Sequence, residues 1–320
     1  MSSIKNFVLN LEDLQTVGSD LQQPESVIAE QDGTLWVSDK RGGVTRIDTE
    51  GAQALLDGIG GEPNGLAMDR EGNLLVANLA DGCLYKLYRD GRHEVVLDNI
   101  DGVSLGAVNF PFIDSQDRLW LSVTSRRTPW FLAAADPQPD GYILLIDQRG
   151  TRIVADGLLA ANEARLDAAE EYLYVAETMA RRVVRYRVGS AGELGAQEVF
   201  GPADFGPGGY VDGLTFDVEG NLWVATVLRN GIRILAPNGE SHVVFEEPNE
   251  PALVNLDAQI AAGALTPEDF FATAGRTVQF PTSIAFAGLD LRTVYLGSLA
   301  MPHLLRFTAP VSGLPLRHWR

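Results

Sequence analysis

The segment at residues 212–224, DGLTFDVEGNLWV, decides the fold, because its arrangement recurs along the chain. It has a short apolar run, a tight turn of Asp, Glu, Gly and Asn, and a second apolar run that contains a tryptophan. Two apolar runs of four to six residues around a polar turn are typical of a β-hairpin. The other copies are 25–37 (ESVIAEQDGTLWV), 64–76 (NGLAMDREGNLLV) and 109–121 (NFPFIDSQDRLWL), and, with a longer turn, 162–175 (NEARLDAAEEYLYV) and 282–296 (TSIAFAGLDLRTVYL).

Each copy is followed by further alternating runs, such as YILLID at 142–147 and then RIVAD at 152–156. Four short strands per repeat are typical of the blades of a β-propeller. We therefore predict an all-β, six-bladed β-propeller with four antiparallel strands per blade. A strand near 14–18 (LQTVG) should close the ring against the last blade, because an open ring would expose sheet edges.

The repeats also settle the domain organisation. A length of 320 residues alone suggests two domains, but six blades use nearly the whole chain. We therefore expect one domain over residues 1–320. Its channel strands, the first of each repeat, should start near residues 25, 64, 109, 162, 212 and 282.

Composition narrows the class of protein. The chain is 45% hydrophobic and 21% charged, which is ordinary for a globular protein. Its net charge of −18 disfavours nucleic acid and anionic membrane surfaces as partners. Cys83 is the single cysteine, and the first residues, MSSIKNFVLN, do not resemble a secretory signal. We expect a cytoplasmic protein.

The first residue of each channel strand should lie at one mouth of the central channel. In register, these residues are Glu25, Asn64, Asn109, Asn162, Asp212 and Thr282. Carboxylate and amide oxygens suit a hard divalent cation such as Ca²⁺. Asn and Asp are also common turn residues, which offers a purely structural explanation. Glutamate has no comparable turn preference, so Glu25 favours a metal site.

Four of these strand starts carry a resemblance to a known family. PESV at 24–27, VNF at 108–110, ANE at 161–163 and VDG at 211–213 resemble the senescence marker protein / gluconolactonase / luciferin-regenerating enzyme family. The resemblance implies a six-bladed propeller that holds one divalent cation and hydrolyses lactones.

By position, the resemblance also implies roles for individual residues. Glu25, Asn162 and Asp212 would be metal ligands, and Asp212 would be the general base. Asn109 would contact the metal or the substrate. Asn64 and Thr282 lie outside the family's ligand set and would line the channel.

We therefore expect a divalent-metal-dependent hydrolase that opens a small-molecule lactone or ester. Ca²⁺ is the expected ion, and Zn²⁺, Mn²⁺, Fe²⁺ and Mg²⁺ are alternatives. Two other functions stay open: hydrolysis of an organophosphate or another ester at the same site, and a non-catalytic calcium-binding or ligand-binding propeller.

Two long segments bear on the substrate. The loop at 124–141 carries Arg126 and Trp130, and could form a wall of the active site or pack outside the third blade. The insertion at 249–275, with a helix start at Thr266, could form a lid or a brace between blades 5 and 6. We predict that Asn109, Arg126, Trp130 and His303 bind substrate.

The substrate prediction is modified by one departure from the family. The sugar lactonases that this chain resembles carry arginine and aspartate where it has Ala107 and Phe110. The loss of these polar groups favours a ligand less polar than a sugar lactone.

Overall fold

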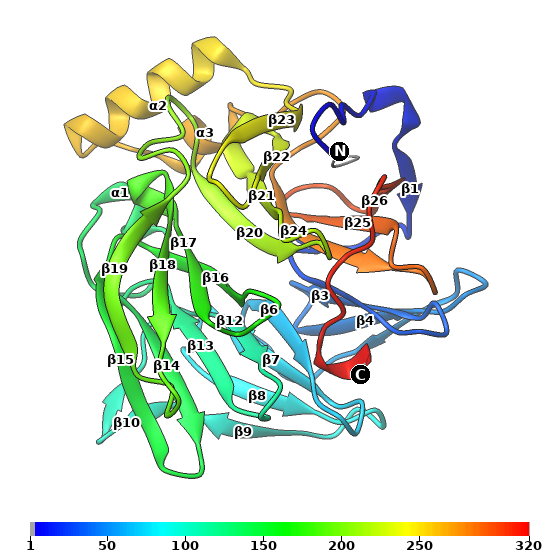
Figure 1. Ribbon diagram of the computed structural model, residues 1–320, viewed down its shortest axis with the longest axis vertical. Coiled ribbons are helices and arrows are strands. Elements are labelled where there is room, and N and C mark those ends of the chain that lie inside the picture. The colour runs from blue at the N-terminus through cyan, green and yellow to red at the C-terminus, as the bar shows by residue number, and fades with distance from the viewer. Residues whose placement is uncertain (1–3, 320) are drawn as a thin grey trace.

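The computed structural model of the protein describes residues 4–319 and contains six four-stranded antiparallel sheets in that range, which confirms the predicted propeller (Figure 1). In blades 1 to 5 the strands follow in chain order from the channel outward, and in blade 6 the first strand of the chain lies outside the last strand. Blades 1 to 3 are β2 (Val27–Ala29), β3 (Leu35–Asp39), β4 (Gly43–Ile47), β5 (Gln53–Leu56); β6 (Pro63–Met68), β7 (Leu74–Asn78), β8 (Leu84–Leu87), β9 (His93–Leu97); and β12 (Val108–Ile113), β13 (Leu119–Val123), β14 (Gly141–Asp147), β15 (Gly150–Leu158). Blades 4 to 6 are β16 (Ala161–Leu166), β17 (Tyr172–Glu177), β18 (Arg182–Val188), β19 (Leu194–Phe200); β20 (Val211–Phe216), β21 (Leu222–Thr226), β22 (Gly231–Leu235), β23 (Ser241–Phe245); and β24 (Pro281–Ala287), β25 (Thr293–Ser298), β26 (Leu304–Thr308) with β1 (Gln15–Val17). A small ribbon of β10 (Asn99–Ile100) and β11 (Val103–Ser104) precedes blade 3.

The ring closes through its two ends. Strand β1 pairs antiparallel with β26, with Thr16 opposite Leu305, and Figure 1 shows β1 beside the last blade. This is the closure predicted from residues 14–18. It removes the exposed edge that β26 would otherwise present.

The polar turn in each repeat has a structural purpose. In blade 5, Asp217 accepts hydrogen bonds from the backbone N–H groups of Glu219 and Asn221 and from the indole N–H of Trp223 (3.0 Å). In blade 3, Asp114 accepts from Trp120 in the same way (2.9 Å). The repeated Asp and Trp are thus coupled, because the carboxylate satisfies both the turn and a buried indole.

The core lies between the blades. Six clusters of buried side chains each join two neighbouring blades, and the cluster between blades 5 and 6 also takes Ile4 and Leu9 from the N-terminal segment. Because both faces of each sheet pack against a neighbouring blade, the strands have nearly continuous apolar sequences.

Helices occur in the two long segments. The loop at 124–141 contains α1 (Leu132–Ala135), and the insertion at 249–275 contains α2 (Glu250–Ala262) and α3 (Pro267–Phe271). The helix predicted at Thr266 is α3, where Thr266 and Asp269 form a capping box. The remaining helices are single 3₁₀ turns: η1 (Leu11–Asp13), η2 (Thr178–Ala180), η3 (Val227–Arg229) and η4 (Arg317–Trp319).

The helices of the two long segments meet over one face of the propeller. A seventh apolar cluster joins Ala134 of α1, Leu256 of α2 and Phe270 of α3, and Figure 1 shows the three helices together. We call α1, α2 and α3 the helical roof. Within residues 4–319, no helix combines the length and apolar character that a bilayer crossing would need.

Candidate metal centre and substrate cavity

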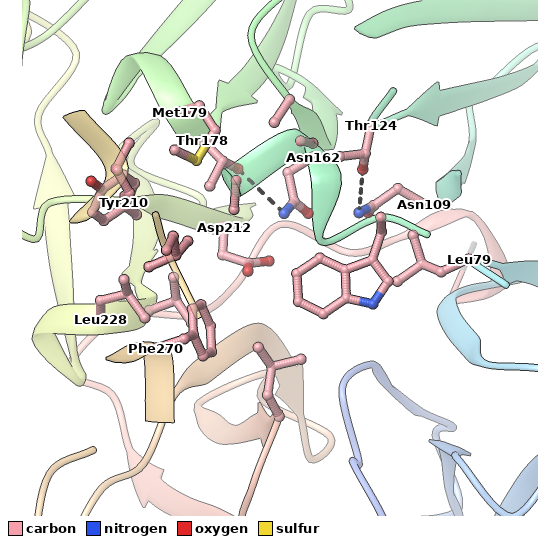
Figure 2. A pocket seen from close by; sticks show the side chains of 18 of the residues that line it. Leu79, Asn109, Thr124, Asn162, Thr178, Met179, Tyr210, Asp212, Leu228 and Phe270 are labelled. Atoms are coloured by element: carbon pink, nitrogen blue, oxygen red, sulfur yellow. Dashed lines mark hydrogen bonds between the residues drawn. The ribbon is translucent and has the colours of Figure 1, made fainter. Parts of the chain in front are cut away.

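The starts of the channel strands converge at one mouth of the channel. Asn109 on β12, Asn162 on β16 and Asp212 on β20 line one cavity (Figure 2). Glu25, two residues before β2, lies close enough to Asp212 for the two charges to interact. The structure therefore brings together the four residues that the sequence predicts as metal ligands. Asn64 and Thr282 occupy the equivalent positions in blades 2 and 6.

Local irregularities in the channel strands present these residues. The pairing of β20 with β21 shifts register between Val211 and Leu214, and similar shifts occur in β6, β12, β16 and β24. Such a bulge interrupts the regular alternation of side chains between the two faces of the strand. Next to Asp212, a Cβ on Gly213 would lie 1.9 Å from the carbonyl oxygen of Thr282. Glycine at 213 thus allows β20 and β24 to approach closely beside the site.

Each predicted ligand has one buried side-chain oxygen without a hydrogen-bond partner in the described part of the chain. These atoms are Glu25 Oε2, Asn109 Oδ1, Asn162 Oδ1 and Asp212 Oδ1. Buried polar atoms are normally paired, because an unpaired one loses its hydration without compensation. Four such oxygens at one mouth fit the ligand preferences of a hard divalent cation. No cluster of three or more His, Cys, Asp or Glu occurs within residues 4–319, so this donor set depends on its two amides.

Two threonines orient the amides. The hydroxyl of Thr124 donates to the carbonyl oxygen of Ala161 (3.0 Å), so it can only accept from the amide N–H of Asn109 (2.9 Å). The hydroxyl of Thr178 donates to the carbonyl of Val211 (2.8 Å) and accepts from the amide of Asn162 (3.4 Å). Both amide nitrogens therefore face a threonine, which leaves both amide oxygens free for the site (Figure 2).

The site concentrates negative charge. Burial, and then the carboxylates of Asp212 and Glu163, raise the pKa of Glu25 well above its ordinary value. Burial and then Glu163 likewise raise the pKa of Asp212. Without a counter-charge, carboxylates this deeply buried favour their protonated forms. A divalent cation bound at this mouth would offset the cost of keeping the buried carboxylates ionised.

Glu163 and Arg165 form a buried ion pair beside this site. The carboxylate of Glu163 accepts from the backbone N–H of Leu214 (3.0 Å) and lies 3.1 Å from the guanidinium of Arg165, which sits 4.4 Å from the ring centroid of Phe110. Burial raises the pKa of Glu163 to about 7, and Arg165 opposes this effect. Glu163 therefore connects β16 to the strand that carries Asp212.

The cavity beyond the ligands is enclosed mainly by apolar side chains. It contains about 660 Å³ of space free of protein atoms, part of it open to solvent. Figure 2 shows Asp212 between the asparagines and the apolar side chains of Leu228 and Phe270. The helical roof contributes Ala133 and Ala134 from α1, Leu256 and Ile260 from α2, and Phe270 from α3.

The four predicted substrate-binding residues separate into two groups. Asn109 and Trp130 line the cavity. Arg126 is not among the lining residues: its guanidinium binds the carboxylate of Asp156 through two 2.9 Å hydrogen bonds. His303 is half-buried outside the lining, and burial lowers its pKa.

Sequence reasoning missed three contributors to the site: Thr124, Thr178 and Glu163. The two threonines could have been found from their position in the repeat. In blades 2 to 6, the residue directly after the second strand lines the cavity. These residues are Leu79, Thr124, Thr178, Val227 and Leu299. For Glu163 the signal was weak, because a bulge, which the sequence does not reveal, turns its side chain into the channel.

Curated relatives are distant. The chain is 23% identical over 265 residues to a 6-deoxy-6-sulfogluconolactonase of Pseudomonas putida, covering 82% of this chain and 78% of that protein. It is 24% identical over 218 residues to strictosidine synthase-like protein 4 of Arabidopsis thaliana, covering 65% of this chain and little more than half, 57%, of that protein. It is 26% identical over 192 residues to a diisopropyl-fluorophosphatase of Loligo vulgaris, covering 58% and 61%.

Solved structures share the fold. A luciferin-regenerating enzyme superposes with a TM-score of 0.73 at 17% identity, covering 95% of this chain and 97% of that one. A Xanthomonas campestris gluconolactonase gives 0.69 at 18% identity, covering 93% and 89%. Regucalcin of Agrobacterium tumefaciens, described as a calcium-binding protein, gives 0.69 at 15% identity, covering 94% and 95%.

The family model supplies the classification. Residues 24–256 match the model of the SMP-30/Gluconolactonase/LRE-like region, a range that includes all four predicted ligands. The chain therefore belongs to the SMP-30/gluconolactonase/LRE-like family.

Proposed function

We propose that the protein is a divalent-metal-dependent hydrolase that opens the ring of a lactone. The observation that carries this proposal is the group of four buried, unpartnered oxygens on Glu25, Asn109, Asn162 and Asp212 at one mouth of the channel. Membership of a family that includes gluconolactonases supports it, as does the similarity to a sulfogluconolactonase.

Glu25, Asn109, Asn162 and Asp212 would hold the ion. When bound, a divalent cation supplies a Lewis acid for the carbonyl oxygen and for the charge that develops on it. Ca²⁺ is the proposed ion, because all the donors are oxygens, and Mg²⁺, Mn²⁺, Zn²⁺ and Fe²⁺ are the alternatives to test. Thr124 and Thr178 keep the two amide oxygens directed at the site.

Asp212 is the proposed general base. Among the described residues that line the cavity it is the one carboxylate, so it can take the proton from a water that attacks a carbonyl there. A cation bound beside it would offset the burial and the repulsion by Glu163 that raise its pKa, so Asp212 would be ionised and able to accept that proton.

A second candidate function is hydrolysis of an organophosphate or an acyclic ester at the same site. The apolar walls around Asp212 and the similarity to a diisopropyl-fluorophosphatase favour it. A non-catalytic calcium-binding propeller would use the same ligands but would need no base.

The test is a panel of γ- and δ-lactones, aryl esters and a fluorophosphate, assayed by acid release. The protein is first stripped with EDTA and then reloaded separately with Ca²⁺, Mg²⁺, Mn²⁺, Zn²⁺ or Fe²⁺. We expect lactone turnover that is lost with EDTA and restored by at least one ion. No turnover of any substrate with any ion would overturn the enzymatic proposal. Turnover confined to the fluorophosphate or the esters would favour the second candidate.

A further inference from the structure

The walls of the cavity offer a ligand few hydrogen bonds. Apart from Asp212 and the two Asn–Thr pairs at its floor, the lining consists of aliphatic and aromatic side chains. Both threonine hydroxyls donate to backbone carbonyls, and each asparagine amide donates one of its two N–H groups to a threonine. The polar capacity of the floor is thus limited to the oxygens directed at the candidate metal centre and to the second N–H of each amide.

Two aromatic side chains in the lining carry a polar group: Tyr210 contributes its ring, and Trp130 contributes its ring and one indole N–H. The hydroxyl of Tyr210 donates to Asp257 on α2 (2.7 Å), which lies outside the cavity lining. The ring of Trp130 meets that of Phe270 edge to face, with 6.5 Å between centroids. Trp130 therefore joins the 124–141 loop to α3 as part of a continuous apolar wall.

The helical roof is tied to the propeller by polar contacts outside the cavity. Asn230, at the end of η3, donates to the carbonyl oxygen of Thr273 (2.8 Å) and accepts from the N–H of Phe280 (2.9 Å). Arg229 binds Glu250 at the start of α2 (3.0 Å). These ties hold the roof in place without adding polar atoms to the cavity, so its apolar character is part of the fold.

Such a cavity discriminates between ligands by polarity. Each hydroxyl of a sugar lactone buried against these walls without a partner would weaken binding about 5- to 150-fold. Each methylene buried there would strengthen binding about three- to fourfold. The balance favours an apolar substituent over a polyhydroxylated one.

We propose that the physiological substrate is a lactone or ester with an alkyl or aryl substituent, which lies between η3, Trp130 and the helical roof while the carbonyl lies at the floor beside Asp212. This inference rests on the proposed function for the identity of the reacting group. The apolar binding site itself does not depend on turnover.

The first experiment compares hydrolysis along a homologous series. The substrates are γ-butyrolactone, γ-hexalactone, γ-octalactone, γ-decalactone and glucono-δ-lactone, all with the metal-loaded protein. We expect kcat/KM to rise about three- to fourfold per added methylene until the cavity is filled, with glucono-δ-lactone below γ-octalactone. A flat series, or a preference for glucono-δ-lactone, would overturn the inference and leave the hydrolase proposal standing.

The second experiment measures binding without turnover. The probes are 5-methyl- and 5-hexyl-pyrrolidin-2-one, γ-lactams that resemble the lactones but resist hydrolysis, titrated by calorimetry and tryptophan fluorescence. We expect the hexyl compound to bind at least about 50-fold more tightly. Equal affinities would overturn the inference. If no lactone is hydrolysed but the hexyl lactam binds selectively, the hydrolase proposal fails while the apolar site stands.

A matched pair of variants on α2 locates the binding site. Ile260→Gln places an amide in the cavity wall, whereas Val254→Gln changes the exposed face of the same helix, where Val254 is 66% exposed. Ile260→Gln should weaken binding of the hexyl lactam at least tenfold, and Val254→Gln should leave it within twofold. Leu299→Gln, in the loop after β25, is a second test of the wall should Ile260→Gln fold poorly. Hexyl-lactam affinity unchanged by folded wall variants would contradict this placement.

Discussion

At the scale of single residues, identical chemical groups have different functions according to their surroundings. Asp212 and Asp217 both lie in blade 5 and are both buried. The carboxylate of Asp217 accepts hydrogen bonds from its own turn and from Trp223, whereas Asp212 Oδ1 has no partner among residues 4–319. The first stabilises the blade, and the second is available for a cation and a water.

Replacing Asp212 tests its proposed catalytic role. In Asp212→Asn we expect kcat for the best lactone to fall about 10²–10⁴-fold, because the amide cannot take a proton from water. Steady-state kinetics with the metal-loaded protein measures this change. The exposed Asp13→Asn is the charge-matched control and should keep kcat within twofold. Wild-type turnover in Asp212→Asn would assign the base to another group.

The Glu163–Arg165 pair makes a separate prediction about stability. Either Glu163→Gln or Arg165→Met should lower the free energy of unfolding by about 3–5 kcal/mol, because each leaves the opposite charge buried and unpaired. The double variant should lose much less than the sum of the two. Denaturant unfolding of all four proteins measures this coupling. Strictly additive losses would mean that the pair is energetically uncoupled.

At the scale of elements, the two mouths of the channel are closed differently. The helical roof covers the mouth that carries Asp212, and the C-terminal segment covers the side of the hairpin turns. There Arg317 binds Asp117 in a blade 3 turn (2.8 Å), and Leu314 donates to Phe216 of blade 5 (2.8 Å). The last residues therefore link blades that are far apart in the sequence.

His318 makes the docking of this segment sensitive to pH. Burial lowers the pKa of His318, whose Nε2 lies 3.0 Å from the carbonyl oxygen of Ala29. Because the folded state favours the neutral imidazole, its contribution is present above the unfolded pKa of about 6.5 and is lost as pH falls through the lower folded pKa.

We therefore expect the wild type to lose more unfolding free energy between pH 7.5 and 5 than His318→Gln does. Denaturant titrations across that range measure the difference. The control, His93→Gln, replaces an exposed histidine and should follow the wild type. Identical pH profiles for wild type and His318→Gln would contradict the prediction.

At the scale of the whole molecule, six blades must remain closed around one axis. Two features act across the ring: the pairing of β1 with β26, and the four predicted ligands, which come from blades 1, 3, 4 and 5. The first joins the chain ends, and the second brings acidic side chains together where they repel one another.

Removing residues 1–18 tests the closure. The truncation deletes β1 and the buried Leu9, and it leaves β26 as an exposed edge, so we expect lower stability and self-association through that edge. Thermal unfolding and light scattering measure both effects. A synthetic peptide of residues 1–18 should restore stability, and the same peptide with Thr16→Pro should restore it less. A truncated chain as stable as the full one would show that β1 is dispensable.

Removing metal tests the second feature. Ca²⁺ should raise the melting temperature of the EDTA-stripped protein, because an ion at 100 times its Kd stabilises the folded state by about 2.7 kcal/mol. Glu25→Gln should reduce this gain, and the control Asp13→Asn should not. Thermal unfolding with increasing Ca²⁺ measures it. An unchanged melting temperature with every ion of the panel would contradict a metal centre at this mouth.

The sequence alone determined the six blades, the closing strand and the residues at the channel mouth, including Glu25 and Asp212. These features depend on alternation and turn spacing, which are properties of neighbouring residues repeated in register. Only the tertiary structure decided that Trp130 lines the cavity while Arg126 binds Asp156, and that Glu163 pairs with Arg165. The physical reason is that a long side chain can reach several hydrogen-bond partners, and a bulge changes the direction in which a strand residue points. Which partner is bound depends on residues that only folding brings into contact.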